Sequence, residues 1–304
     1  MTRPRCALAG GPASTTIREA VEAAGGDVVD PSEAHAVIWL DPHDGAGLGK
    51  LLAEHPQIEW VQLPWAGIEP FSDVLDDDRV WTCGKGVYAE PVAEHALALA
   101  LAGLRGVGAY ARQRRWSDPM GTNLVGGRAV ILGGGGIARV LVRLLQPFGT
   151  QLTVVRRHPE PMTGVADVVG PDRLHHVLGH ADLVVLALAL TPETRGVIDA
   201  EALAAMPSHA WLVNVARGAH VVTDALVDAL AAGSIGGAGL DVTDPEPLPD
   251  DHPLWSMDNA LITPHVGNTP EMGEVLLAAR IRENVRRWDS GQPLLGGVHT
   301  DLGY

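Results

Sequence analysis

Short apolar runs alternate with amphipathic stretches over most of the chain, and this pattern limits the fold more than any other feature. In the first hundred residues the apolar runs are CALAG, DVVD, AVIWL and IEWVQLP, and the stretches TTIREAVEAAG and GLGKLLAEHP lie between them. Parallel strands need a long crossover connection, which a helix usually supplies. The alternation therefore predicts an α/β protein with a mostly parallel sheet.

A second, more regular alternation begins at Arg128, after a polar linker that contains glycine and follows Trp116. Its strand-like runs are RAVILG, QLTVV, DLVVLALAL, AWLVNV, GAGLDV and NALITPH. A chain of 304 residues is longer than one hydrophobic core normally serves, so two domains are expected. We place a discontinuous first domain at residues 1–100 plus 283–304 and a second domain at residues 101–282.

Composition narrows the set of partners. The formal net charge is -15 and the chain has two lysines, so a nucleic acid or an anionic membrane surface is not expected as a partner. Cys6 and Cys83 are too few for a disulfide framework or a metal cluster, and we expect buried thiols, no metal and a reducing, cytoplasmic setting. The longest apolar stretch, residues 92–104, is shorter than the ~20 residues of a membrane span.

A glycine-rich segment, Gly133-Gly-Gly-Gly-Ile-Ala138, joins the strand RAVIL to the helix RVLVRLLQPFG. In such a loop Gly133 permits a tight turn, Gly135 lets the backbone approach a pyrophosphate, and the small Ala138 permits close packing of helix and strand. Gly136 and Ile137 open the helix, whose free N–H groups attract phosphate. The segment predicts a dinucleotide-binding loop.

The next strand, QLTVV, determines which dinucleotide is expected. About 20 residues after the loop, an acidic residue would accept a hydrogen bond from the ribose 2′-OH of NAD. This chain has Arg156 and Arg157 there instead, and two guanidinium groups can bind a 2′-phosphate. We predict NADP(H) as the preferred cofactor, with NAD(H) as the alternative.

Three ionisable residues each follow a predicted strand of the second domain. Arg217 follows WLVNV, Glu246 lies between two prolines downstream of GAGLDV, and His265 follows Pro264 after NALIT. Ligands of parallel α/β sheets bind at the carboxyl ends of the strands. The three residues are therefore candidates for one catalytic site.

In this order and spacing, the segments GGGGIA, LTPETRGVID, NVARG, GAGLDVTDPEPLPDDHPLW and TPHVG resemble the D-isomer-specific 2-hydroxyacid dehydrogenase family. The resemblance is strong from about Tyr88 to Asn284 and looser before it. It implies two Rossmann-like or flavodoxin-like parallel-sheet domains with an active-site cleft between them. Residues 101–282 would bind NAD(P), the discontinuous domain would bind the substrate, and the activity would be that of a D-2-hydroxyacid dehydrogenase or 2-keto acid reductase.

The resemblance implies Arg217, Glu246 and His265 as the catalytic set, and elementary chemistry gives each a role. Arg217 carries a permanent charge and a planar fork that matches a carboxylate, so it suits binding and polarising a 2-keto acid. His265 suits proton transfer to the carbonyl oxygen, since imidazole titrates near neutral pH. A carboxylate paired with it, Glu246, favours the protonated ring.

Further site residues come from the resemblance alone. Asp241 would contact the nicotinamide carboxamide, and Thr191 with Pro192 would lie against the cofactor.

In the first domain, Trp65, Ala66 and Gly67 fall where the family holds the substrate carboxylate with backbone N–H groups. The family usually has a small residue in place of Trp65, so the pocket is expected to differ in shape. Lys85 and Tyr88 are further candidates for its lining.

The remaining histidines have no matching context and are expected at the surface or in structural roles: His175, His176, His180, His209 and His220. His95 is expected to pack at a domain or subunit seam. It lies on an apolar helix that begins near Glu90, which predicts a homodimer because such a helix must be buried between domains or subunits.

Two alternatives stay open. A formate-type dehydrogenase shares the fold but carries Gln where this chain has Glu246. A dinucleotide-sensing interaction module of the corepressor type could keep every motif without catalysing a reaction. Detectable NADPH oxidation with a 2-keto acid separates the enzyme from the sensor.

Overall fold

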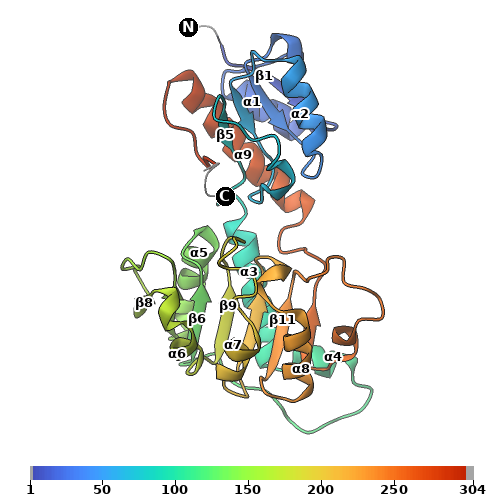
Figure 1. The fold of residues 1–304 in the computed structure, drawn as a ribbon, viewed down its shortest axis with the longest axis vertical. Helices are drawn as coiled ribbons and strands as arrows, with labels where there is room; N and C mark the ends of the chain where they lie inside the picture. Colours follow the sequence, from blue (N-terminus) through green and yellow to red (C-terminus); the bar gives the residue numbers. More distant parts are fainter. Residues whose placement is uncertain (1–2, 299–304) are drawn as a thin grey trace. The chain divides into compact units, whose positions relative to one another are not determined.

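Two parallel sheets organise residues 3–298, the part of the chain that the computed structural model describes (Figure 1). The five-stranded sheet belongs to a unit that runs up to Tyr88 and resumes at Thr269, and the seven-stranded sheet belongs to the continuous unit Ala89–Asn268. The predicted class, two parallel-sheet α/β domains, is confirmed. No helix among the described residues is long and apolar enough to span a membrane.

The seven-stranded sheet is parallel throughout, and its strand order reverses direction beside β6, which pairs with both β7 and β9. Such a reversal marks the point where parallel α/β sheets bind ligands. In spatial order the strands are β12 (Ala260–Ile262), β11 (Gly237–Leu240), β10 (Trp211–Asn214), β9 (Leu183–Leu186), β6 (Arg128–Leu132), β7 (Gln151–Val155) and β8 (Asp167–Val169).

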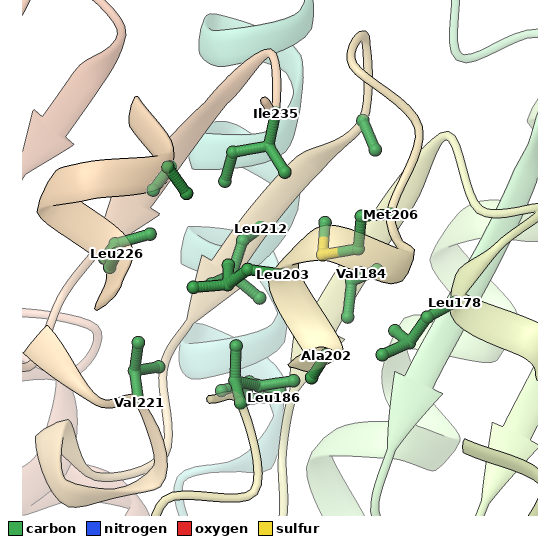
Figure 2. Packing of buried hydrophobic residues seen from close by; sticks show 14 of the residues in the cluster. Leu178, Val184, Leu186, Ala202, Leu203, Met206, Leu212, Val221, Leu226 and Ile235 are labelled. Carbon is green, nitrogen blue, oxygen red and sulfur yellow. The ribbon is translucent and has the colours of Figure 1, made fainter. Parts of the chain in front are cut away.

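Helices cover both faces of this sheet, which explains why its central strands are apolar on both sides. On β10, Leu212 packs into one core and Val213 into the other. Figure 2 shows the first core, where side chains of the sheet meet those of three helices. These helices are α6 (Leu174–Leu178), α7 (Ala200–Ala205) and α8 (Thr223–Ala231). The opposite core is covered by α3 (Ala89–Leu104) and α5 (Gly136–Leu145), and α4 (Val107–Arg112) follows α3.

The apolar helix α3 is buried within its own unit. Ala93, Ala96 and Ala100 are fully buried in the core that α3 shares with β10. A Cβ atom added at Gly103 would lie 2.2 Å from the ring of Trp211, so the small residues let the helix approach the sheet closely. Burial within one unit therefore accounts for the apolar surface that the sequence assigned to a domain or subunit seam.

The five-stranded sheet has the order β2 (Asp27–Val28), β1 (Arg5–Ala9), β3 (Ala36–Trp39), β4 (Trp60–Gln62) and β5 (Val80–Thr82). Its helices are α1 (Thr15–Ala23), α2 (Gly45–Glu54) and α9 (Pro270–Asp289). Alternate residues of β3 face two cores: Val37 packs with the side chains of α2, and Ile38 with those of α1 and α9.

The units of the structure meet after Tyr88 and after Asn268, whereas the sequence placed the boundaries after residues 100 and 282. Helix α3 belongs to the second unit because its core faces β10 and β11. Helix α9 belongs to the first because Ile281 packs with Val21 and because Asn284 Nδ2 donates to Gln62 Oε1 at 2.9 Å.

Candidate active site

The glycine-rich loop follows β6, and its glycines meet two different requirements. Gly133 has φ +112, and a Cβ atom there would lie 2.2 Å from the Ala187 carbonyl oxygen, so only glycine fits the turn. Gly135 has no atom within 4 Å of an added Cβ, which leaves its backbone open to a ligand. No side chain among the described residues caps α5 at Gly135, while Ala138 is buried. The loop fits a pyrophosphate at the positive end of α5.

Arg156 and Arg157 follow β7, as the sequence predicted. The side chain of Arg156 lies beside the glycine loop, 3.0 Å from the Cβ position of Gly134. Its Nη1 is 3.9 Å from Glu160 Oε2, and Arg157 Nη2 lies 3.3 Å from Glu193 Oε2. Both ion pairs are solvent-accessible and therefore weak, so an incoming phosphate can compete for the guanidinium groups.

Thr191 lies in a turn after β9 and connects to this pair of arginines. Its hydroxyl donates to Glu193 Oε2 at 2.7 Å, and its N–H donates to Thr194 Oγ1 at 2.8 Å. The bond from Thr191 lowers the pKa of the Glu193 carboxyl, with a smaller contribution from Arg157. Sequence reasoning did not single out Glu193, whose position beside Arg157 depends on the turn.

His265 and Glu246 are in direct contact: His265 Nδ1 lies 2.7 Å from Glu246 Oε1. Both side chains remain accessible, at 48% and 42% exposure, so the second ring nitrogen, Nε2, can be reached by a ligand. The pair joins the end of β12 to the loop that follows β11. The pairing expected from the sequence is present in the structure.

The backbone around this pair is anchored from both sides. Thr243 N–H donates to Glu246 Oε2 at 3.4 Å, and Thr223 Oγ1 donates to the Asp244 carbonyl at 2.6 Å. His265 has φ +54, and its N–H donates to the Asp241 carbonyl at 2.8 Å. A histidine in the left-handed region is uncommon and is held here by its surroundings.

Asp241 holds the segment around His265 in place through hydrogen bonds. Its carboxylate accepts hydrogen bonds from Thr263 Oγ1 at 2.6 Å, Val266 N at 2.9 Å and Gly267 N at 2.9 Å. Burial by itself raises the pKa of this carboxyl, but the hydrogen bonds outweigh burial and the pKa falls to about 2.

His95 contributes to the same network from α3. Its Nε2 lies 2.9 Å from Thr263 Oγ1 and 3.2 Å from Asp241 Oδ1. His95 therefore supports the carboxyl ends of β11 and β12. The sequence placed it on the correct helix but gave no signal for these partners.

Arg217 follows β10 and begins a short 3-10 turn, Gly218–His220. Its carbonyl accepts from Asn214 Nδ2 at 2.9 Å, and its Nη1 donates to the Ala216 carbonyl at 2.8 Å. A Cβ atom at Gly218 would lie 1.9 Å from the Thr243 carbonyl oxygen. Glycine is thus required because the backbone after Arg217 touches the loop that carries Glu246.

His220 is fully buried beside Arg217. Its Nδ1 lies 3.2 Å from Arg217 N, and its Nε2 lies 3.2 Å from the Ala189 carbonyl oxygen. Burial lowers the pKa of this ring. A histidine three residues after the arginine was visible in the sequence, but its orientation depends on the 3-10 turn.

In the other unit, Trp65 is 44% exposed and its indole meets His43 edge to face, with ring centroids 5.0 Å apart. The indole therefore faces away from the core. Among residues 3–298, no hydrogen bond from the N–H of Ala66 or Gly67 is present, so both can serve a ligand. The Tyr88 hydroxyl donates to the Pro64 carbonyl at 2.6 Å and supports this loop from behind.

Topology brings the catalytic candidates of the second unit to one edge of one sheet. Arg217, Glu246 and His265 follow β10, β11 and β12, which are adjacent strands. The glycine loop and the two arginines follow β6 and β7 at the same edge, because parallel strands end on the same side. Together these residues can bind a dinucleotide, hold a carboxylate and transfer a proton.

Comparisons with known proteins identify the family of this chain. Residues 96–267 match the sequence model of the family described as "D-isomer specific 2-hydroxyacid dehydrogenase, NAD binding domain". A Corynebacterium melassecola protein described as an uncharacterized protein in the proB 3′ region is 40% identical over 255 residues, which cover 81% of this chain and 84% of that protein. Glyoxylate/hydroxypyruvate reductase A of Serratia proteamaculans is 30% identical over 289 residues, with 89% and 87% covered.

A solved structure extends the likeness to the whole chain. The D-isomer specific 2-hydroxyacid dehydrogenase of Xanthobacter autotrophicus, in complex with NADPH and MES, has a TM-score of 0.85 and 30% identity, and all of both chains is covered. The present chain belongs to the D-isomer specific 2-hydroxyacid dehydrogenase family and is an NAD(P)-dependent oxidoreductase of that class. The family expected from the sequence segments is confirmed.

Proposed function

We propose that this protein reduces a small 2-keto acid to the D-2-hydroxy acid, with Arg217, Glu246 and His265 as its catalytic residues. The observation that carries the proposal is the 2.7 Å contact between His265 Nδ1 and Glu246 Oε1, after strands β12 and β11, of which β11 is adjacent to β10, the strand that precedes Arg217. A proton donor oriented by a carboxylate, next to a permanent cation, matches what reduction of a keto acid requires.

The hydrogen bond to Glu246 decides which nitrogen of His265 acts. The proton on Nδ1 faces the carboxylate, so Nε2 is the nitrogen that donates a proton to the carbonyl oxygen of the substrate. In the reverse reaction, Nε2 of the neutral ring accepts the hydroxyl proton. Reduction is therefore favoured at lower pH and oxidation at higher pH.

Arg217 binds the substrate carboxylate and polarises the carbonyl group. For Ala66 and Gly67 of the other unit, we propose that their N–H groups, which make no hydrogen bond within the described residues, donate to a ligand. The nicotinamide, when bound, supplies the hydride. Gly133, Gly135 and the first turn of α5 would hold its pyrophosphate. For Asp241 we propose a contact to the nicotinamide carboxamide in addition to its role at the end of β12.

Glyoxylate and hydroxypyruvate are the first substrates to assay, because the Serratia relative is named for their reduction. The test is a panel of 2-keto acids with NADPH and NADH in parallel, read as loss of absorbance at 340 nm. Turnover with a 2-keto acid supports the proposal. No turnover across a broad panel would favour the dinucleotide-sensing alternative, and formate oxidation would favour a formate-type enzyme, against which Glu246 counts.

NADP(H) is proposed as the preferred cofactor, and the support is Arg156 beside the glycine loop together with Arg157, the next residue after β7. The double substitution Arg156→Asp with Arg157→Ser should lower the ratio of kcat/KM for NADPH to that for NADH by 10-fold or more, since two charge-assisted contacts are removed at about 1.5–3 kcal/mol each. An unchanged ratio would refute the preference.

A homodimer and a cytoplasmic location are also proposed. For the dimer, the support is apolar surface near α4: Trp116 is 100% exposed and Val107 is 53% exposed. For the location, it is that Cys6 and Cys83 are both buried and free. Light scattering after size exclusion tests the assembly state.

A further inference from the structure

His220 is a buried side chain whose polar atoms all meet backbone groups at the active site. It has no solvent-exposed surface, and it lies in the 3-10 turn directly after Arg217. Its two ring nitrogens contact Arg217 and Ala189, which follow the adjacent strands β10 and β9. The ring thus connects two strand ends of the candidate active site.

The hydrogen bonds available to each nitrogen determine where the proton resides. The Ala189 carbonyl can only accept, so Nε2 must carry a proton and donate at 3.2 Å. The Arg217 carbonyl oxygen also lies 3.0 Å from Nδ1, but it already accepts from Asn214 Nδ2 and from the His220 backbone N–H. The Arg217 N–H, by contrast, needs an acceptor, and Nδ1 lies 3.2 Å away. One neutral tautomer, protonated on Nε2, satisfies all these groups.

Charge supports the same assignment. Burial has the largest effect and lowers the pKa of the His220 ring. The hydrogen bonds to the backbone of Ala189 and Arg217 raise it, and the charges of Arg217 and Arg195 lower it, so the pKa falls overall. A protonated ring would add a third positive charge, and its Nδ1–H would face the Arg217 N–H, so that two donors would meet without an acceptor. The neutral ring is therefore the one that fits the turn.

We infer that His220 is a positioning residue for substrate binding: it fixes the backbone of Arg217 through Nδ1, in the manner of the third residue of a capping box. Its bond to Ala189 ties that backbone to the segment leading into Thr191. The inference rests on the proposed role of Arg217. Loss of the bond to Arg217 should therefore weaken binding of the 2-keto acid and leave cofactor binding unchanged.

Two substitutions separate the contacts. His220→Asn keeps an acceptor at the position of Nδ1 and loses the bond to Ala189. His220→Leu keeps a similar volume and loses both bonds. The difference between the two variants therefore measures the contact to Arg217. Leu226→Ala is the control, since it opens a cavity in the core that also contains Val221, the residue after His220 (Figure 2).

The readouts are the Kd of oxamate for the NADPH-loaded protein, measured by calorimetry, and the Kd of NADPH itself. His220→Leu should raise the oxamate Kd by about 10- to 100-fold, because displacing a binding group by about 1 Å has effects of that size. His220→Asn should stay within about threefold of the wild type, as should Leu226→Ala. The Kd of NADPH should stay within about twofold throughout.

The inference is overturned if His220→Leu binds oxamate as the wild type does, or if His220→Asn is as weak as His220→Leu. A measurement on the unchanged protein remains decisive should the leucine variant not fold: ¹⁵N shifts of His220 at pH 8 must show the neutral Nε2–H tautomer. An Nδ1–H tautomer would contradict the hydrogen-bond assignment. Arg217→Lys tests the proposed function separately, because an unchanged oxamate Kd in that variant would remove the role of Arg217 whatever His220 does.

Discussion

The substitution Gly218→Ala should impair both catalysis and stability, and the structure gives the size of each effect. A Cβ atom at this position would lie 1.9 Å from the Thr243 carbonyl oxygen and 2.0 Å from its carbon. Ordinary contacts begin at 3.4 Å, so Gly218→Ala requires the two segments to separate by 3.4 − 1.9 = 1.5 Å. One segment carries Arg217 and the other leads to Glu246, so the movement must change the distance between their side chains.

Two effects of this separation can be estimated. Displacing a catalytic group by about 1 Å lowers activity about 100-fold, so kcat/KM should fall by at least about that factor. Overpacking of a close contact costs about 1–3 kcal/mol, which corresponds to a fall in Tm of about 2–12 °C for a unit of this size.

Gly179→Ala is the matched control in the same unit. The nearest atoms to its Cβ position lie at 3.5 Å, and its φ of −61 suits alanine. Its kcat/KM and Tm should equal or slightly exceed the wild-type values. Steady-state assays with NADPH and glyoxylate, together with calorimetric unfolding, measure both quantities. A Gly218→Ala variant with wild-type kcat/KM would show that the close approach to Thr243 does not set the catalytic geometry.

Three further predictions address the remaining groups. His265→Asn removes the proton donor and should lower kcat by about 10²- to 10⁴-fold while the Kd of NADPH, measured by fluorescence, stays the same; near-normal turnover would contradict the assignment. Asp241→Asn should destabilise the protein by about 2 kcal/mol at pH 7, because a pKa lowered from 3.8 to about 2 favours the folded state by that amount. This contribution is present above pH 4 and lost as the pH falls to 2. The free energies of unfolding of the two proteins, measured in urea, should therefore differ more at pH 7 than at pH 3, and an equal difference would refute the reasoning. Glu193→Gln removes a charge that competes with the 2′-phosphate for Arg157. Two unit charges about 7 Å apart in water interact with an energy that changes an equilibrium constant about threefold. The kcat/KM for NADPH should therefore rise about threefold while that for NADH stays constant, and a rise for both would point to another cause.

The sequence predicted the features that depend on local pattern. Apolar runs located most strands because a sheet covered on both faces needs them, and the glycine spacing located the loop after β6 because a tight turn beside a phosphate leaves few alternatives. The short edge strand β8 and strand β5 were not predicted. Each has three residues, too few for a periodic pattern to be recognised.

Contacts between distant segments were harder to predict. Neither the bond from His95 to Thr263 nor the pairing of Arg157 with Glu193 has a local signature, since each depends on how loops from different strands meet. Gly218 is an instructive case. The sequence shows a glycine directly after Arg217, but the atom that requires it belongs to Thr243, 25 residues later in the chain.

The strand order also has a consequence for how this enzyme can change. From β7, which carries the arginines, to β11, which precedes Glu246, the sheet crosses four strand spacings, or about 19 Å at 4.8 Å each. Charges that far apart are screened at physiological salt, where the Debye length is about 8 Å. Substitutions that exchange one dinucleotide for the other should therefore leave the protonation chemistry unaltered, so cofactor choice and catalysis can vary independently by mutation.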